Sequence, residues 1–453
     1  MGVDLAQAMM EDVHTAMIVG AGFSKAVAHL PLTDELGNEL RRRVPGLFTR
    51  RVQAFHGGSF EALLSRLAEP QPDLDDVTNA NNRALFAAAT VGLQEILVEH
   101  EARALSREMP QWLHRLVRTL HATKSDVITF NYDTLMERAA ITSGCWDQEA
   151  NRPINTESLL QGLPPVLPGT LGDEDVATFR VMKLHGSLDC FWVRGDTAGS
   201  TIVRLPGNRR WDPLEPSDQR HTRLAPGREP FIVPPASAKS AFYNNPITRQ
   251  LWRDARAALQ AADQVALIGY SLPLTDLVTA GMIGDALSGS QKPIHIVNPD
   301  PEPLCDRLST LGIESRSFHV HGGRSCVEDF TRHLSWNEAK RQLAALSRLD
   351  HDAPLAVFDV ANGLFPVVRV VKIAQGIGLE VDPSLRLDDL TASGSRAGAA
   401  KVGQILRAGS EDFAAGLFLV RSGLDVDHIP ILETRRADAG WVLLTPSQPL
   451  GPE

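Results

Sequence analysis

Short apolar runs that end in small or polar residues recur along the first 330 residues of the chain. Each run has the length and composition of a buried strand, and each is followed at once by a turn. Helical patterns, such as residues 245–262, separate several of them. Strands that alternate with helices predict an α/β fold with a right-handed, doubly wound parallel sheet of the Rossmann-like type. The runs are Thr15–Val19, Val127–Phe130, Arg180–Leu184, Gln264–Ile268 and Pro293–Val297.

The stretch between the first two strands, about residues 34–121, is predicted to be a helical insertion. Within it, Phe60, Leu63, Leu64 and Leu67 fall at the i, i+3, i+4, i+7 spacing of an amphipathic helix. Residues 70–82 are polar and predict a loop, and residues 83–121 again read as helical. The insertion is about 90 residues long, more than a simple strand-to-strand crossover needs.

The last hundred residues have a different character. A chain of 453 residues is expected to form more than one domain. We predict a first domain over residues 1–349 and a small C-terminal α+β domain over residues 353–453. Val367–Val371 and Leu417–Val420 are its predicted strands. This second region contains no motif that points to chemistry.

Composition excludes several classes of function. A formal charge of -10 and a pI near 5.8 argue against direct nucleic-acid binding, which favours basic surfaces. No uncharged apolar run approaches the roughly 18 residues of a membrane span. The N-terminal segment carries acidic residues and lacks a signal-peptide pattern, and the four cysteines form no C-x-x-C pair. We therefore expect a cytoplasmic protein with reduced thiols and no structural zinc.

The first strand leads into Gly20-Ala21-Gly22-Phe23-Ser24. Glycines at a strand-to-helix turn let the backbone approach a pyrophosphate, which the free N–H groups of the helix start would bind. The third glycine of the dinucleotide fingerprint is replaced by Lys25, and no Walker lysine follows. A plain tight turn is the alternative.

Two other strand ends carry groups capable of chemistry. Asn131 and Asp133 follow the second strand, where they could face a pocket or simply cap the next helix. His185 follows the third strand, and Gly186 leaves one side of it open. With an ordinary pKa near neutral, histidine is the natural proton acceptor at pH 7. A structural role for His185 stays open, and His319 with His321 could offer two metal ligands but no third.

Taken together, these segments resemble the NAD-binding motifs of sirtuins. Five pieces occur in the sirtuin order, over about residues 14–330. Two departures set the chain apart from the protein deacylases: the paired C-x-x-C zinc ligands are absent, and Leu30-Pro-Leu-Thr-Asp34 replaces their Pro-Asp-Phe-Arg segment. The chain is more similar to sirtuin-like domains of bacterial antiphage defence systems. The five pieces are Gly20-Ala-Gly22-Phe-Ser24, Thr129-Phe-Asn131-Tyr-Asp133, Lys183-Leu-His185-Gly186-Ser187, Gly269-Tyr-Ser271-Leu and Ile296-Val-Asn298.

The resemblance implies an NAD+ glycohydrolase that cleaves NAD+ to nicotinamide and ADP-ribose and so starves an infected cell of NAD. In that family Asn131 would orient the ribose or the water, His185 would be the base, and Asp133 would support the nicotinamide ribose. No general acid is needed, because nicotinamide leaves as a neutral molecule, and no metal is required. The remaining implied cofactor-binding residues are Gly20, Ala21, Gly22, Phe23 and Ser24 at the pyrophosphate, and Gly269, Ser271 and Asn298 on the adenosine side.

The resemblance also implies control by assembly. We expect a homo-oligomer or a complex with a HerA-like ATPase, an Argonaute-like protein or another defence-system partner. Two alternatives remain for the activity itself. The chain could bind NAD or ADP-ribose without turnover as a sensor or assembly subunit, or it could be a sirtuin-type deacylase or ADP-ribosyltransferase.

Overall fold

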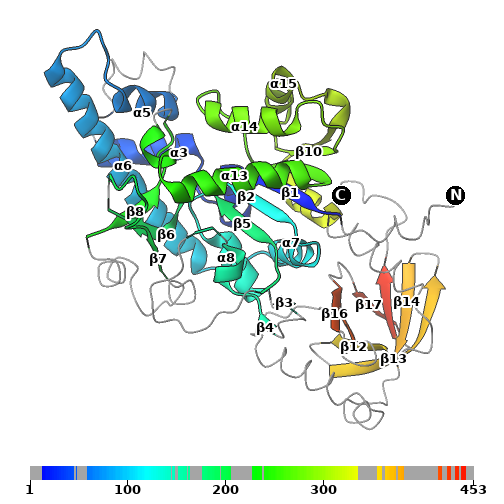
Figure 1. Ribbon diagram of the computed structural model, residues 1–453. Coiled ribbons are helices and arrows are strands. Elements are labelled where there is room, and N and C mark those ends of the chain that lie inside the picture. The colour runs from blue at the N-terminus through cyan, green and yellow to red at the C-terminus, as the bar shows by residue number, and fades with distance from the viewer. Residues whose placement is uncertain are drawn as a thin grey trace.

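The computed structural model describes most of the first 334 residues and a set of strands nearer the C-terminus (Figure 1). The described residues are 13–334, without 45–46, 48–58, 144, 148–151, 161, 164–175, 194, 206–226 and 237–238, together with strands between residues 355 and 444.

A six-stranded sheet forms the centre of the first part, with the order β11-β10-β9-β1-β2-β5. Every neighbouring pair in it is parallel. Counted along the chain from the β5 edge, the order is 3-2-1-4-5-6, which is the strand order of dinucleotide-binding sheets. This confirms the predicted doubly wound parallel fold. The strands are β1 (Thr15–Val19), β2 (Asp126–Thr129), β5 (Arg180–Lys183), β9 (Gln264–Ile268), β10 (Ile294–Val297) and β11 (Phe318–His321).

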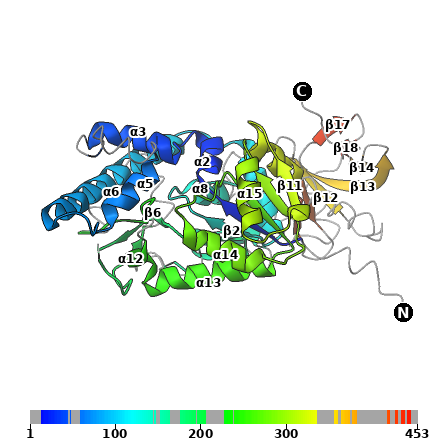
Figure 2. The same cartoon turned by 90° about the horizontal axis from the view of Figure 1, so that it is seen from above.

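Helices cover both faces of this sheet (Figures 1 and 2). Side chains alternate between the faces, so Met17 and Val19 enter one core while Ala16 and Ile18 enter the other. On the Met17 side pack α2 (Ala21–Ala28), α7 (Gln111–Ala122) and α8 (Leu135–Thr142). On the Ile18 side pack α13 (Pro246–Ala261), α14 (Leu277–Leu287) and α15 (Glu302–Thr310).

The helical insertion forms a third packing unit. It contains α3 (Thr33–Arg43), α5 (Phe60–Ala68) and α6 (Asp76–Leu105). Its apolar side chains pack against Leu188 and Ile232 of a separate antiparallel sheet with the order β7-β6-β8. The strands of that sheet are β6 (Gly186–Trp192), β7 (Val203–Arg204) and β8 (Glu229–Ile232).

The predicted loop over residues 70–82 was too long. Asp75 accepts a hydrogen bond from the Thr78 N–H and begins α6, so residues 76–82 are helical. A polar run is compatible with the first turns of a helix whose outer face meets water. Shorter elements complete this part of the chain: β3 (Trp146–Asp147), β4 (Arg152–Pro153), α9 (Thr156–Leu159), α12 (Ser240–Tyr243) and the 3-10 turn η2 (Ser315–Ser317).

The described residues of the C-terminal region are all in strands. Five form an antiparallel sheet with the order β12-β13-β14-β18-β17, and β15 pairs with β16. Both strands predicted here are present, whereas the described residues of the region include no helix. The strands are β12 (Leu355–Asp359), β13 (Gly363–Ile373), β14 (Gly376–Val381), β15 (Leu417–Val420), β16 (Val426–Ile429), β17 (Thr434–Ala437) and β18 (Gly440–Leu444).

The predicted domain boundary near residue 350 lies outside the described residues and stays a prediction. Among the helices that the structure describes, none combines the length and the apolar character required to cross a bilayer.

Candidate active site

The glycine turn after β1 is locked to the loop that follows β9. The Gly20 N–H donates to the Ile268 carbonyl (3.0 Å) and the Gly22 N–H to the Gly269 carbonyl (2.9 Å). A Cβ on Gly22 would lie 2.8 Å from the Gly269 Cα, and Gly269 has a φ of +57°. Glycine is therefore required because two backbones touch at the point where the strand order reverses.

The hydrogen bonds of Gly20 and Gly22 bear on the expectation that the N–H groups of this turn bind a pyrophosphate. Two of the amides expected to face a pyrophosphate are already bonded to the neighbouring loop. The Phe23 N–H likewise donates to the Gly20 carbonyl (3.0 Å), and the Phe23 ring is buried against Trp112. Within this segment, Gly20 and Gly22 are thus the residues whose N–H groups donate to described residues of β9 or the loop after it.

Asn131, Ser24 and Asp133 form one hydrogen-bonded chain between β1 and β2. The Asn131 Nδ2 donates to the Gly20 carbonyl (2.9 Å) and to the Ser24 Oγ (2.8 Å), and the Ser24 hydroxyl donates to the Asp133 Oδ2 (2.7 Å). The carbonyl partner fixes which amide atom is nitrogen. The Asn131 Oδ1 has no hydrogen-bond partner among the described residues, so it is available to accept from a ligand hydroxyl.

Asp133 also meets the predicted capping role. Its Oδ1 accepts from the Leu135 N–H (3.2 Å) at the start of α8. Burial raises the pKa of Asp133, although Lys183 and the Ser24 hydroxyl act in the opposite direction. Thr134, the next residue, is held by Glu101 of α6, whose Oε1 accepts from both the Thr134 N–H (2.8 Å) and its hydroxyl (2.9 Å). Capping and ligand positioning are compatible here.

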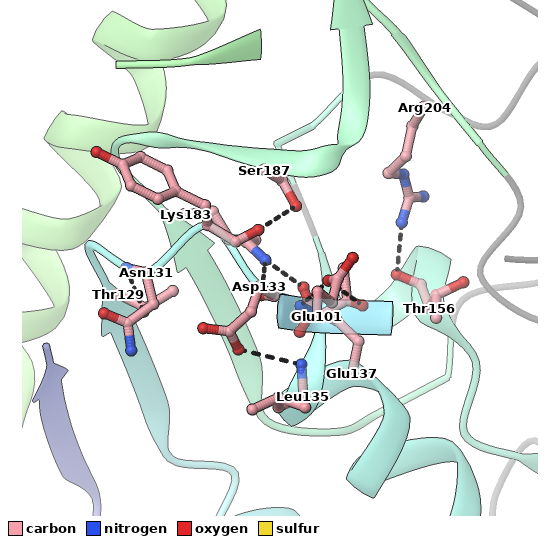
Figure 3. Close-up of polar contacts among 12 residues, drawn as sticks. Glu101, Thr129, Asn131, Asp133, Leu135, Glu137, Thr156, Lys183, Ser187 and Arg204 are labelled. Atoms are coloured by element: carbon pink, nitrogen blue, oxygen red, sulfur yellow. Dashed lines mark hydrogen bonds and ion pairs between the residues drawn. The ribbon is translucent and has the colours of Figure 1, made fainter. Parts of the chain in front are cut away.

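A buried ion pair between Lys183 and Glu137 contacts the backbone at this strand end (Figure 3). Lys183 Nζ lies 2.8 Å from the Glu137 Oε1 and donates to the Asp133 carbonyl at 2.5 Å. The two side chains are only 1% and 2% exposed. Burial raises the pKa of Glu137 to about 7. Burial also opposes the charge on Lys183, but the carboxylates of Glu137, Asp189 and Asp133 raise its pKa.

His185 lies on the neighbouring strand end, 6% exposed. Its ring packs against Phe130, with ring centroids 4.9 Å apart, and its Nε2 lies 3.3 Å from the Tyr243 hydroxyl. Burial, aided by the charge of Lys239, lowers its pKa to about 3. The expectation of a near-neutral pKa was therefore wrong, because the imidazole is enclosed by apolar rings. It stays neutral at pH 7 and is a weak base.

A second buried ion pair lies on the His185 side of the site. Lys239 Nζ is 3.0 Å from the Asp276 Oδ1, with side chains 5% and 3% exposed, and the Tyr270 hydroxyl donates to the Asp276 Oδ2 (3.1 Å). Tyr270 stacks on Phe130 at 4.7 Å, which in turn contacts His185. Sequence reasoning missed both ion pairs and Tyr243. A lysine inside the apolar run 181–184 was the one signal that could have indicated Lys183.

The residues expected on the adenosine side lie beyond β9 and β10. Asn298 Nδ2 lies 3.5 Å from the Tyr270 carbonyl, and the Asn298 N–H donates to the His321 carbonyl (3.1 Å). Ser271 is exposed, and Arg307 donates to its carbonyl. With Gly269 beside Gly22, the predicted site residues gather at the carboxyl ends of adjacent strands.

The paired histidines of β11 lie beside a further aromatic ring from β10. His295 of β10 is a third imidazole, with its Nδ1 3.1 Å from the His321 Nε2 and its ring stacked on His319 at 5.1 Å. Even so, the described part of the chain contains no group of three or more His, Cys, Asp or Glu residues arranged to hold a metal ion.

A scan against protein-family models finds no match, and neither does a search of the curated proteins. Solved structures that resemble the chain include sirtuins. A Sir2 enzyme shares 12% identity, covering 73% of this chain and 94% of its own, with a TM-score of 0.34. A Sir2 homologue mutant in complex with ADP ribose shares 16% identity, covering 77% and 100%, with a TM-score of 0.37. Likenesses with TM-scores this low carry no information about the chemistry of the site.

Proposed function

We propose that this chain is an NAD+ glycohydrolase that releases nicotinamide and ADP-ribose. The observation that carries the proposal is the placement of Asn131 and His185 on neighbouring strand ends. Asn131 is bonded directly to Gly20 at the point where the sheet order 3-2-1-4-5-6 reverses. Dinucleotides bind across that crevice in sheets of this order. The sirtuin-like motifs of the sequence occupy the same strand ends.

The chemistry requires little of the protein. The C1'–N1 bond breaks with its electron pair passing to the nicotinamide nitrogen, and an oxocarbenium-like centre remains on the ribose. The free Oδ1 of Asn131 would accept from a ribose hydroxyl or from the attacking water. Asp133, held by Ser24 and the α8 start, would place a carboxyl group near the developing positive charge.

A weak base is sufficient for the water step. Water that has joined an oxocarbenium carbon is strongly acidic, so a neutral imidazole can accept its proton even with a pKa of about 3. The low basicity has a benefit as well, since His185 stays deprotonated at neutral pH.

The decisive experiment is chromatography of the purified protein after incubation with NAD+, scoring nicotinamide and ADP-ribose. We expect release by the wild type and loss in Asn131→Ala and His185→Ala. Matched controls are Asn81→Ala and His319→Ala, which change exposed residues of α6 and β11. Full activity in both site variants would refute the assignment.

The same assay separates the other activities. Faster nicotinamide release with an acyl-lysine peptide, accompanied by acyl transfer to ADP-ribose, would instead indicate a deacylase. Saturable NAD+ binding without any turnover would indicate a sensor. In line with the family resemblance, we further propose an antiphage effector that acts by NAD depletion, controlled by self-assembly or a defence-system partner through the C-terminal region. Deleting residues 353–453 should then alter activity or assembly.

A further inference from the structure

The chain has only three tyrosines. Tyr132 and Tyr270 follow strands β2 and β9, and Tyr243 is the last residue of α12. The Tyr132 hydroxyl donates to the Val233 carbonyl (2.6 Å), and the Tyr270 hydroxyl donates to Asp276. Tyr243 differs from both, because its hydroxyl meets the Nε2 of His185 at 3.3 Å. It is thus the tyrosine whose hydroxyl contacts the proposed base.

Tyr243 is also the more accessible member of that pair. His185 is buried, whereas Tyr243 is half-buried. The Tyr243 ring packs edge-on against Trp252 with centroids 5.1 Å apart, and Phe130 holds the imidazole from its own side. The Trp252 indole N–H is buried and has no hydrogen-bond partner among the described residues. The aromatic rings therefore fix both groups in one geometry.

We propose that Tyr243 is a proton relay between the attacking water and His185. The inference rests on the proposed NAD+ hydrolysis. As the water oxygen bonds to C1', one water proton passes to the Tyr243 Oη, and the Tyr243 proton passes to the His185 Nε2. The products are ADP-ribose, neutral Tyr243 and an imidazolium that later loses its proton to solvent.

The surroundings support a concerted transfer. Burial raises the pKa of Tyr243 and lowers that of His185, so both groups are neutral at rest and a tyrosinate intermediate is unfavourable. Lys239 opposes formation of the imidazolium and Asp276 favours it. The relay requires the Tyr243 hydroxyl to donate to the His185 Nε2 in the resting state, which places the single ring proton of His185 on Nδ1.

The test substitution is Tyr243→Phe, which removes the hydroxyl and keeps the ring against Trp252. Its matched control is Tyr132→Phe, which removes a buried hydroxyl that does not contact His185. The first readout is the tautomer of His185 by nitrogen-15 NMR, assigned with His185→Gln. We expect the Nδ1–H form in the wild type and in Tyr132→Phe, and a shift toward Nε2–H in Tyr243→Phe. An identical tautomer in wild type and Tyr243→Phe would overturn the relay.

The second readout separates water attack from bond cleavage. Labelled nicotinamide recaptured by the oxocarbenium centre measures exchange, while ADP-ribose measures hydrolysis. Proton transfer by a positioned group contributes about 10²–10⁴-fold, so Tyr243→Phe should raise the exchange-to-hydrolysis ratio at least about 10-fold. A structural defect would lower both rates and leave the ratio unchanged, which would also overturn the relay. If the tautomer shifts but the wild type hydrolyses no NAD+, the proposed function fails and the relay with it, while the hydrogen bond stands.

Discussion

Replacing Lys183 by methionine should be among the most damaging single changes in the chain. The substitution keeps the length of the side chain but removes the cation from a position 1% exposed. It leaves Glu137 without its 2.8 Å partner and the Asp133 carbonyl without its donor. Removing one member of a buried ion pair costs about 3–5 kcal/mol. That is a large share of the about 5–15 kcal/mol that stabilises a typical fold.

The loss should depend on pH in a definite direction. Burial already raises the pKa of Glu137 to about 7 from its ordinary 4.5, and without Lys183 it rises further. The folded state of the variant then binds more protons than the unfolded state between about pH 4.5 and the raised pKa of Glu137. Its stability therefore falls as pH rises through that range, by up to about 1.4 kcal/mol per pH unit for one group. The cost should be larger at pH 8 than at pH 5.5.

Urea unfolding followed by tryptophan fluorescence at both pH values measures this effect. Lys25→Met is the matched control, because Lys25 pairs with Glu35 at the surface, where the two side chains are 41% and 50% exposed. Exposed pairs contribute about 0–1 kcal/mol. A loss of stability in Lys183→Met no larger than in Lys25→Met, or a cost that is the same at the two pH values, would refute the ion-pair explanation. Adding Glu137→Gln to Lys183→Met should recover part of the loss.

Three further predictions concern stability. Gly269→Ala should destabilise the protein by at least about 2 kcal/mol in urea titrations, because the φ of Gly269 is +57° and the new Cβ would lie 2.3 Å from the Phe23 nitrogen. Gly281→Ala is the control: its new Cβ would meet open space, so the substitution should be neutral or stabilising. Burial lowers the pKa of His295 to about 4, so the melting temperature should fall as the pH is lowered from 6.5 toward 4. His295→Gln should weaken that pH dependence; a melting temperature that falls equally steeply with pH in the variant would contradict the assignment. Asp126→Asn removes the carboxylate that accepts two hydrogen bonds from Arg180, so the melting temperature should drop by several degrees. Asp285→Asn, which breaks the exposed pair with Arg256, should change it little.

Five of the six strands of the sheet could be predicted from the sequence because they are short and almost wholly buried, whereas β11 is partly exposed. Runs such as residues 265–268 are apolar throughout and are followed by a glycine or a polar residue. The antiparallel strand β6 was not predicted, since residues 186–192 mix apolar residues with Ser187, Asp189 and Cys190. Its burial comes from tertiary contacts: Leu188 packs against the helical insertion, and Cys190 and Trp192 pack against Ile202 and Phe231.

The strand-end residues of the site could likewise be predicted, but their environment could not. Asn131, Asp133 and His185 follow buried strands, so their place at one edge of the sheet follows from parallel topology. The partners Glu137, Lys239 and Asp276 do not, because no periodicity distinguishes a charged residue that folds inward. The lowered pKa of His185 has the same origin, since its burial and the charge of Lys239 come from segments distant in the chain.

The contact between Glu101 and Thr134 gives the helical insertion a mechanical connection to the site. Helix α6 has 30 residues and so spans about 45 Å, with Glu101 near one end and Asp76 at the other. Through Glu101 the helix holds Thr134, the residue next to Asp133. A displacement of α6 would therefore be passed directly to the backbone beside that carboxyl group. The packing of the insertion is thus part of what sets the alignment of the candidate site, although most of its residues lie far from it.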